Sequence, residues 1–377
     1  MIRAIKIRLK PTKEQEILMW KSIGIARFAY NWGLARQEEN YKKASELISC
    51  RKLRDEFNKL KSTEEFTWLN EISSKTINQA FEDLQTAYNN FFDGIAKHPK
   101  FKSKKKSRKS FYVRHDAVKF KDGKVKMEKI GKIQCKTNYD IPDLPKYTNP
   151  RCHFDGRYWY LSLGFEQGEN QAGLNKDLSV GIDLGVHDLA IVNCLDNPIK
   201  NINKSGKVKK LKKKVKRLQK QVSRKYEANK QGLQFIKTNN IVKLEKKIGL
   251  IHRELGNIRL NHIHQATNKI IKLRPYRVVM EDLNITGMMK NKHLSEAIQE
   301  QCLYEFMRQI KYKCGFNGIQ FVQVDKFYPS SKTCSCCGSI KSDLKLKDRV
   351  YVCPECGLVI DRDKNASINL GNYKLVE

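Results

Sequence analysis

The sequence is short of acidic residues and has no long apolar run. Its 377 residues include 40 Asp and Glu against 74 Lys and Arg, which gives a formal net charge of +34. No stretch reaches the roughly 18 consecutive apolar residues that a bilayer span needs, and the N-terminus alternates apolar and basic residues like a strand, not a signal peptide. A membrane surface is therefore the weaker partner, and the charge predicts a nucleic acid.

Several common catalytic and cofactor motifs are also missing. The glycines around Gly181 and Gly185 do not form the G-x-G-x-x-G pattern of dinucleotide-binding proteins. None of the eight histidines lies in a nucleophile motif. We therefore expect neither a Ser-His-Asp hydrolase nor a small-molecule cofactor. The eleven cysteines are an odd number, which favours the reducing cytoplasm over an oxidising compartment.

Four of these cysteines are spaced like the ligands of a structural zinc site. They form two C-x-x-C pairs separated by fifteen residues: Cys334, Cys337, Cys353 and Cys356. Each pair precedes a glycine, which permits a tight knuckle whose backbone N–H groups point at the thiolates. Cys336 could compete with Cys337, but it does not repeat the spacing of the second pair. We predict a closed structural zinc site, and the alternative is four reduced cysteines in an ordinary loop.

The first 166 residues change from helical to strand-like patterns. Residues 1–10 are typical of a strand. Residues 13–48 and 50–97 are typical of helices with short breaks, and residues 111–166 of several short strands. Thr12 is a plausible N-cap for the first helix. We expect a small β-barrel that closes with the N-terminal strand, around a helical insertion.

The loop between the helical and strand-like segments is strongly basic. Residues 98–111 carry seven basic side chains and two phenylalanines, Phe101 and Phe111. Such a run is often only a solvated face, but the interleaved serine and phenylalanine favour contact with phosphates. We predict that six residues of this loop bind nucleic acid: Lys102, Lys104, Lys105, Lys106, Arg108 and Lys109.

The second half of the chain combines long helices with apolar strands. Residues 168–178 are polar and are expected to form a linker. Apolar seams within residues 207–228 and 241–262 predict an antiparallel helical hairpin, with a coiled-coil dimerisation arm as the alternative. Pro275 is expected to end the second helix. Three strands are predicted alongside, one beginning at Ser179 and two at residues 276–281 and 319–325.

Three acidic residues occupy positions where a charge is costly unless it is paired or bound to a metal. Asp183 lies in an apolar strand, Glu281 ends another, and Asp361 opens the expected last helix. Each alone could be a cap or turn residue. Together they fit a ribonuclease H-like fold, in which carboxylates hold two divalent ions about 4 Å apart for phosphodiester hydrolysis. Oxygen ligands favour Mg²⁺ or Mn²⁺, so we predict a metal-dependent nuclease.

With these motifs in place, the chain resembles the TnpB family of transposon-encoded RNA-guided DNA endonucleases, relatives of the miniature type V CRISPR effectors. The resemblance covers nearly the whole chain and includes Tyr30-Asn31-Trp32 and the basic loop. It is most specific in four segments: Gly181–Gly185, Glu281–Asn291, Phe327–Cys334 and Asp361–Ala366.

The resemblance implies an α+β multidomain protein. A wedge-like β-barrel would hold a helical recognition insertion, and a RuvC-type (ribonuclease H-like) α/β nuclease domain would hold a zinc ribbon. The expected ranges are 1–10 and 98–167 for the barrel, 11–97 for the insertion, 179–329 and 359–377 for the nuclease and 330–358 for the ribbon. The implied partners are a guide RNA and target double-stranded DNA, cut beside a short flanking motif.

The family roles carry over to residues already singled out. Asp183, Glu281 and Asp361 would be the catalytic, magnesium-binding acids, and the four paired cysteines would bind zinc. Two alternatives stay open: a nuclease-inactive RNA-guided repressor, and a transposase acting on the ends of the element. The presence of all three acids disfavours the first alternative. The large basic surface favours guide RNA over simple end recognition, which disfavours the second.

Overall fold

The computed structural model describes residues 2–137, 141–168, 173–325, 327–345 and 347–374. The chain divides into two compact units, an N-terminal unit, Ile2–Gln167, and a C-terminal unit that begins at Gly168. Within the described residues, no helix is both long enough and apolar enough to cross a membrane. Each unit is described separately below.

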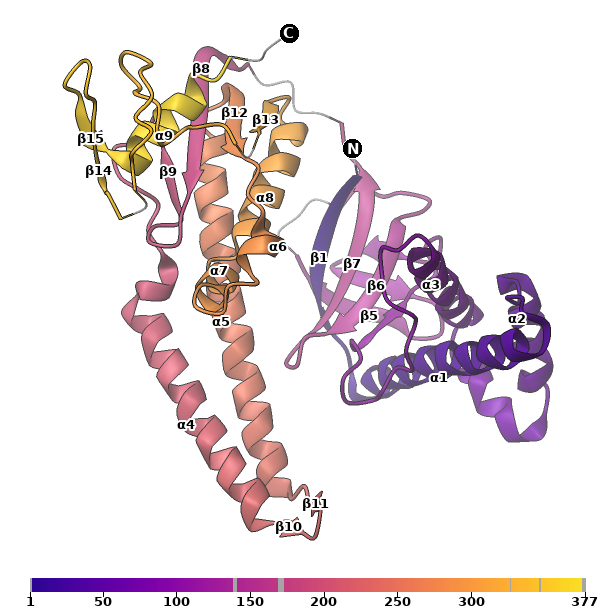
Figure 1. The fold of residues 1–377 in the computed structure, drawn as a ribbon. Coiled ribbons are helices and arrows are strands. Elements are labelled where there is room, and N and C mark those ends of the chain that lie inside the picture. The colour runs from indigo at the N-terminus through magenta and orange to yellow at the C-terminus, as the bar shows by residue number, and fades with distance from the viewer. Residues whose placement is uncertain (1, 138–140, 169–172, 326, 346, 375–377) are drawn as a thin grey trace. The chain divides into compact units, whose positions relative to one another are not determined.

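Helices form one layer of the N-terminal unit (Figure 1). They are α1 (Lys13–Ala44), α2 (Cys50–Lys61), the 3₁₀ helix η1 (Glu64–Glu71) and α3 (Ser74–Phe92). Helix α1 begins after Thr12, as predicted. The Thr12 hydroxyl accepts the backbone N–H of Gln15, and the Gln15 side chain accepts the N–H of Thr12 in return. The aromatic side chains of Phe57 and Phe81 are fully buried between these helices.

The second layer of this unit is a seven-stranded antiparallel sheet in the order β2-β6-β7-β1-β5-β4-β3. Its strands are β1 (Ile2–Lys10), β2 (Ser110–Tyr112), β3 (Lys119–Lys121), β4 (Lys124–Met127), β5 (Gly131–Lys136), β6 (Thr148–Phe154) and β7 (Trp159–Glu166). Alternate residues of β1, namely Ile5, Ile7 and Leu9, are buried against Met19 and Ile23 of α1.

The expectation of a barrel closed by the N-terminal strand is not met among the described residues. Strand β1 lies inside the sheet, where it pairs with β7 from Ile2 to Leu9 and with β5 only from Arg8 to Lys10. The outer strands β2 and β3 have three residues each and pair on one side only. The N-terminal strand therefore joins two halves of an open sheet.

A four-stranded sheet with the order β13-β12-β8-β9 forms the centre of the C-terminal unit. The strands are β8 (Asn175–Leu184), β9 (Ala190–Val192), β12 (Pro275–Glu281) and β13 (Gln320–Val324). Strands β8, β12 and β13 are parallel, and β9 is antiparallel to β8. The expected linker is shorter than predicted, because β8 begins at Asn175, whose N–H donates to the carbonyl of Arg274.

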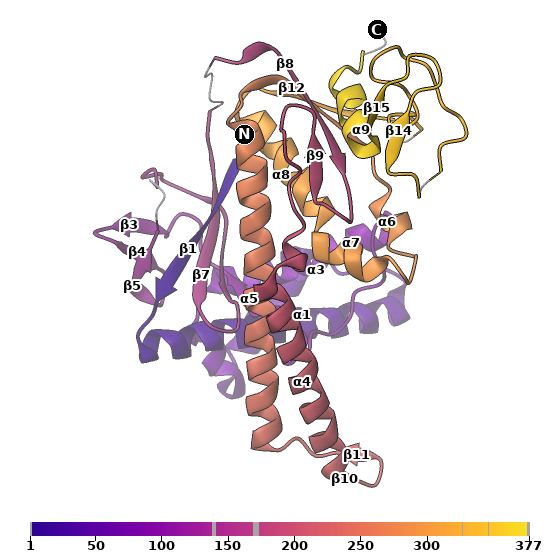
Figure 2. The ribbon, with the colours of Figure 1, turned by 90° about the vertical axis from the view of Figure 1, so that its left-hand side faces the viewer.

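The predicted helical hairpin is present in this unit (Figures 1 and 2). Helices α4 (Gly206–Ala228) and α5 (Asn239–Ile271) pack through one apolar seam, and the two-residue strands β10 (Lys230–Gln231) and β11 (Gln234–Phe235) pair at its far end. Pro275 does not end the second helix as expected. Helix α5 stops at Ile271, and Pro275 is instead the first residue of β12.

Shorter elements complete the C-terminal unit. They are the 3₁₀ helix η2 (Ile202–Lys204), helices α6 (Ile285–Met288), α7 (Ser295–Gln301), α8 (Leu303–Phe316) and α9 (Arg362–Gly371), and the strand pair β14 (Val350–Val352) and β15 (Val359–Asp361). Helices α5 and α8 cover one face of the sheet, where they bury Val278 and Met280 of β12. Helix α9 covers the opposite face, where Leu370 packs against Val279.

The approach of α9 to β8 requires a glycine at position 181. A Cβ there would lie 2.0 Å from the carbonyl oxygen of Ser367 and 2.2 Å from the amide nitrogen of Gly371, both backbone atoms of α9. Backbone atoms cannot move aside as a flexible side-chain end can. The glycine that opens the G-I-D-L-G segment therefore fixes the spacing between the strand that carries Asp183 and the helix that begins after Asp361.

We expect Gly181→Ala to lower the free energy of unfolding of the C-terminal unit by about 2–3 kcal/mol, because the methyl group must displace helix backbone. Gly249→Ala is the matched control, since a Cβ at this α5 position meets nothing within 4 Å. The control should be neutral or more stable by up to about 1 kcal/mol. Chemical denaturation of both variants measures the difference, and equal stabilities would contradict the close-approach argument.

Candidate functional site

The two acidic strand residues lie at the same edge of the central sheet. Strands β8 and β12 are parallel, and Ile182 pairs with Met280. Asp183 and Glu281 are the next residue on each strand, so they lie side by side at the carboxyl ends of neighbouring strands. Side chains alternate along a strand, which places both acids on the face that α9 covers, two residues beyond Gly181 and Val279.

Asp361 reaches the same face from a different element. It ends β15 and is the N-cap of α9, where its Oδ1 accepts the backbone N–H groups of Asp363 at 3.0 Å and Lys364 at 2.9 Å. The ammonium group of Lys364 donates to the carbonyl oxygens of Val192, the last residue of β9, at 3.2 Å and of the next residue, Asn193, at 2.8 Å. The start of α9 is thus attached to the strand next to β8.

The carboxylates influence one another electrostatically. Burial raises the pKa of Asp183 well above its ordinary value, and the negative charges of Glu281, Asp363 and Asp361 raise it further, while Arg362 opposes them. Clustered carboxylates of this kind favour a bound cation, because each charge disfavours ionisation of the next. The donor set consists of hard oxygen atoms, which suits Mg²⁺ or Mn²⁺.

Asp363 is a member of this cluster that sequence reasoning did not single out. It forms ion pairs with Arg362 at 2.8 Å and with Arg349 at 3.4 Å. The only sequence signal was its place as the second acid of the D-R-D segment. Across the described ranges, the four cysteines are the one group of three or more ligand atoms that all lie within 4.8 Å of each other. The carboxylates share an edge of the sheet and, among the described residues, do not form a second group of this kind.

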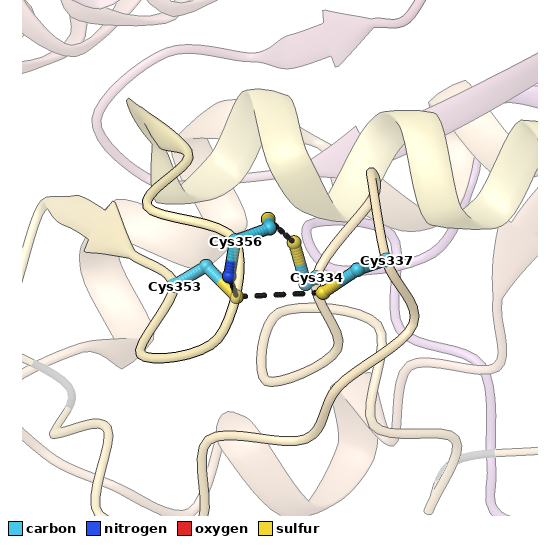
Figure 3. Close-up of side chains that lie close together, drawn as sticks. All are labelled: Cys334, Cys337, Cys353 and Cys356. Atoms are coloured by element: carbon cyan, nitrogen blue, oxygen red, sulfur yellow. Dashed lines mark hydrogen bonds between the residues drawn. The ribbon is translucent and has the colours of Figure 1, made fainter.

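The four cysteines form a compact thiol cluster (Figure 3). The Sγ atoms of Cys334 and Cys356 are 3.6 Å apart, and those of Cys337 and Cys353 are 3.5 Å apart. A tetrahedral zinc ion with Zn–S bonds of about 2.3 Å separates its sulfur ligands by roughly 3.8 Å, so the cluster fits zinc. Cys336 is exposed and lies outside the cluster, so the ligand set chosen from the spacing comes together in the fold.

The two knuckles repeat one local geometry. Gly338 and Gly357 have φ values of +79° and +72°, which favour glycine. Their N–H groups donate to the carbonyl oxygens of Cys334 and Cys353 respectively. The N–H of Cys356 donates to the Sγ of Cys353, and this hydrogen bond is the largest of several that together lower the pKa of that thiol to about 6. Thiolates at neutral pH are the form that binds zinc.

The basic loop of the N-terminal unit divides into two kinds of residue. Four of the six predicted contacts are exposed and available to a ligand: Lys104, Lys105, Lys106 and Arg108. Lys109 instead donates to the carbonyl oxygens of Lys104 and Ser107 and so holds the loop together. A cavity of about 470 Å³ lies beside the loop, and Arg108 and Arg151 are among the residues that line it.

Lys102 packs against the protein, unlike its exposed neighbours. Its Nζ lies 3.3 Å from the centre of the Tyr30 ring, and burial lowers its pKa to about 8. The Asn31 side chain accepts the N–H of Lys102 at 2.8 Å and donates to its carbonyl oxygen at 3.0 Å. Tyr30 and Asn31, which belong to the family resemblance, therefore anchor the beginning of the basic loop.

Comparison with protein-family models identifies three matching segments. Residues 162–292 match "Probable transposase", residues 304–370 match "Cas12f1-like, TNB domain", and residues 1–46 match "Helix-turn-helix domain" of the same transposase family as the first. In the structure, the range matched by the helix-turn-helix model, residues 1–46, holds strand β1 and the single long helix α1.

Two relatives cover nearly the whole chain. A protein of Streptomyces pristinaespiralis named "Putative RNA-guided DNA endonuclease" is 29% identical over 374 residues, which are 98% of this chain and 88% of the relative. "Putative RNA-guided DNA endonuclease InsQ" of Escherichia coli (strain K12) is 27% identical over 386 residues, which are 98% of this chain and 91% of the relative. These matches confirm the resemblance to the TnpB family.

Among solved structures, a mini-RNA-guided endonuclease, CRISPR-Cas_phi3, aligns with 10% identity and a TM-score of 0.49 over 99% of this chain and 92% of the other.

We expect the zinc content to depend on Cys337 and not on Cys336. Cys337→Ser removes a ligand from the cluster, so the variant should lose its zinc and part of the stability of the C-terminal unit. Cys336→Ser should keep about one zinc per chain. Elemental analysis of the purified variants measures this, and zinc loss in Cys336→Ser with retention in Cys337→Ser would reverse the ligand assignment.

Proposed function

We propose that this protein is a transposon-encoded, RNA-guided DNA endonuclease of the TnpB type. The observation that carries the proposal is the carboxylate cluster: Asp183 and Glu281 lie at the carboxyl ends of adjacent parallel strands, and Asp361 caps the helix packed over them. Strand order β13-β12-β8-β9, with β9 antiparallel, supports a ribonuclease H-like, RuvC-type nuclease. The names of the two long relatives support the same activity.

In the proposed mechanism, Asp183, Glu281 and Asp361 hold the divalent ions. Mg²⁺ or Mn²⁺ bound by these acids would activate water and stabilise the leaving 3′ oxygen of the target DNA. The protein supplies geometry: Gly181 sets the spacing of strand and helix, and Lys364 anchors the start of the helix to the turn after β9. The nearby guanidinium of Arg362 offsets part of the negative charge around Asp183.

Positive charge on both units supports binding of guide RNA and target DNA. Helix α4 carries eleven Lys and Arg against one Glu, and its apolar residues face α5. The exposed part of the basic loop offers four further cations. Such contacts grip a phosphate backbone without reading its sequence. Sequence recognition would then come from base pairing with the guide, as in RNA-guided enzymes generally.

Loss of each acid should abolish cleavage without abolishing binding. We expect Asp183→Ala, Glu281→Ala and Asp361→Asn to reduce cutting of a guide-matched target to background in Mg²⁺, because each removes a negatively charged metal ligand. Asparagine at position 361 can still cap the helix, so that variant isolates the charge from the fold.

Asp177→Asn is the matched control, because it neutralises an exposed acid on the same strand β8. It should cut at the wild-type rate. Cleavage is followed on labelled DNA, and guide and target binding by gel shift. Wild-type cutting by any of the three site variants would remove that residue from the site. Target binding by a wild-type protein that never cuts would favour the repressor, and strand joining would favour the transposase.

Neutralising the exposed lysines of the loop should weaken nucleic-acid binding in a salt-dependent way. For the triple variant with Gln at Lys104, Lys105 and Lys106, we expect lower affinity for guide RNA. The slope of log affinity against log salt should fall by about 2, the value for three lost phosphate contacts. Zinc content should not change, because exposed charges contribute little to stability.

The control triple variant places Gln at Lys119, Lys121 and Lys126, three exposed lysines of the β3–β4 hairpin. It changes the net charge by the same amount. Filter binding across a salt series compares the two variants with the wild type. Equal slopes in all three proteins would mean that the loop is only a solvated face.

A further inference from the structure

Two buried asparagines attach the zinc centre to helix α9. Asn365 is fully buried, and its Oδ1 accepts the backbone N–H of Ser335 at 2.9 Å. Ser335 follows the zinc ligand Cys334 directly. The Nδ2 of Asn365 donates to the carbonyl oxygen of Thr333 at 2.7 Å. One side chain thus holds the backbone on both sides of the first cysteine of the cluster.

Asn369, one turn further along α9, holds the segment just before the knuckle. It is 5% exposed, and its Nδ2 donates to the carbonyl oxygens of Ser330 at 2.7 Å and Thr333 at 2.6 Å. The Thr333 hydroxyl donates to the carbonyl oxygen of Pro329 at 2.9 Å, which closes the same segment on itself. Buried amides left without partners are costly, so these bonds fix residues 329–333 against the helix.

The segment ends at the carboxylate site. Ser330 is 3% exposed, and its hydroxyl donates to Oε1 of Glu281. Hydrogen bonds therefore run without interruption from the knuckle of Cys334, through Asn365 and Asn369, to Ser330 and Glu281. The path lies within a single compact unit. Its side chains, Ser330, Asn365 and Asn369, are neither acids of the carboxylate cluster nor ligands of the cysteine cluster.

We propose that Ser330 is a positioning residue that orients Glu281 for metal binding, and that Asn365 and Asn369 make this orientation depend on the zinc centre. This inference rests on the proposed function only in taking Glu281 as a ligand of a divalent ion. Partners that hydrogen-bond a liganding carboxylate fix its orientation, and losing one typically weakens metal binding or activity by 10–100-fold. The zinc ribbon then helps to fix the orientation of Glu281 in the nuclease site.

The first experiment measures Mn²⁺ binding by the full chain without RNA, from the paramagnetic resonance signal of free Mn²⁺. Ser330→Ala should bind Mn²⁺ about tenfold more weakly than the wild type while keeping its zinc. Ser367→Ala is the matched control: this serine is also buried, but its hydroxyl donates within α9, to the carbonyl oxygen of Lys364 at 2.7 Å. The control should bind Mn²⁺ like the wild type.

The second experiment follows cleavage of a guide-matched target. Ser330→Ala should need about tenfold more Mg²⁺ for half-maximal rate, and its rate at saturating Mg²⁺ should approach that of the wild type. A general folding defect would lower the rate at every Mg²⁺ concentration. If the wild type does not cleave, the proposed function fails, whereas the Mn²⁺ measurement still tests the positioning role.

The third experiment tests the dependence on the zinc centre. Asn365→Leu keeps the side-chain size but loses both hydrogen bonds to the backbone on either side of Cys334, so Mn²⁺ binding should weaken. Because both residues act on one path, adding Ser330→Ala should weaken it little further. Additive effects would overturn the coupling to zinc. Wild-type Mn²⁺ affinity in Ser330→Ala, or loss of zinc from that variant, would overturn the positioning role.

Discussion

The contact between helix α9 and strand β8 is the constraint on which the C-terminal unit depends. At Gly181 the two backbones are so close that no side chain fits between them. That contact brings the N-terminus of α9, with its cap Asp361, over the carboxyl ends of β8 and β12. Leu370 of the same helix closes the core on that face of the sheet. The helix is therefore at once a core element, a part of the carboxylate cluster and the support of the cysteine cluster.

The D-R-D-K-N-A segment concentrates these roles in six residues. Asp361 caps the helix, Arg362 pairs with Asp363, and Lys364 reaches the carbonyl groups after β9. Asn365 accepts a hydrogen bond from the backbone of the first cysteine knuckle. Each side chain points to a different neighbour, because successive residues of a helix are separated by about 100° around its axis. A short motif can in this way connect the sheet, the cysteine cluster and the carboxylate cluster.

Sequence reasoning succeeded where the signal is local. The cysteine spacing predicted the thiol cluster, because knuckle geometry depends on a few neighbouring residues. Apolar periodicity predicted the α4–α5 hairpin for the same reason. The sequence did not predict the roles of Ser330 or Asn369, because their hydrogen-bond partners are set by tertiary packing. Nor did the sequence predict that Lys102 lies against Tyr30, since the seven basic residues within residues 98–111 look alike until the fold buries one of them. The open sheet was missed because pairing between distant short strands leaves no periodic trace.

The helical hairpin has a consequence for how the carboxylate site assembles. Asp183 and Glu281 lie on adjacent strands but are far apart in the chain, and the intervening segment contains both α4 and α5. Contacts within the hairpin are between residues close in sequence, so this segment can fold early and shorten the loop that joins the two strands, which reduces the entropy lost on pairing them. Among the described residues, the apolar cluster that joins α4 to α5 contains no residue of the central sheet. A change in the length of the hairpin would therefore leave the apolar core of the sheet intact.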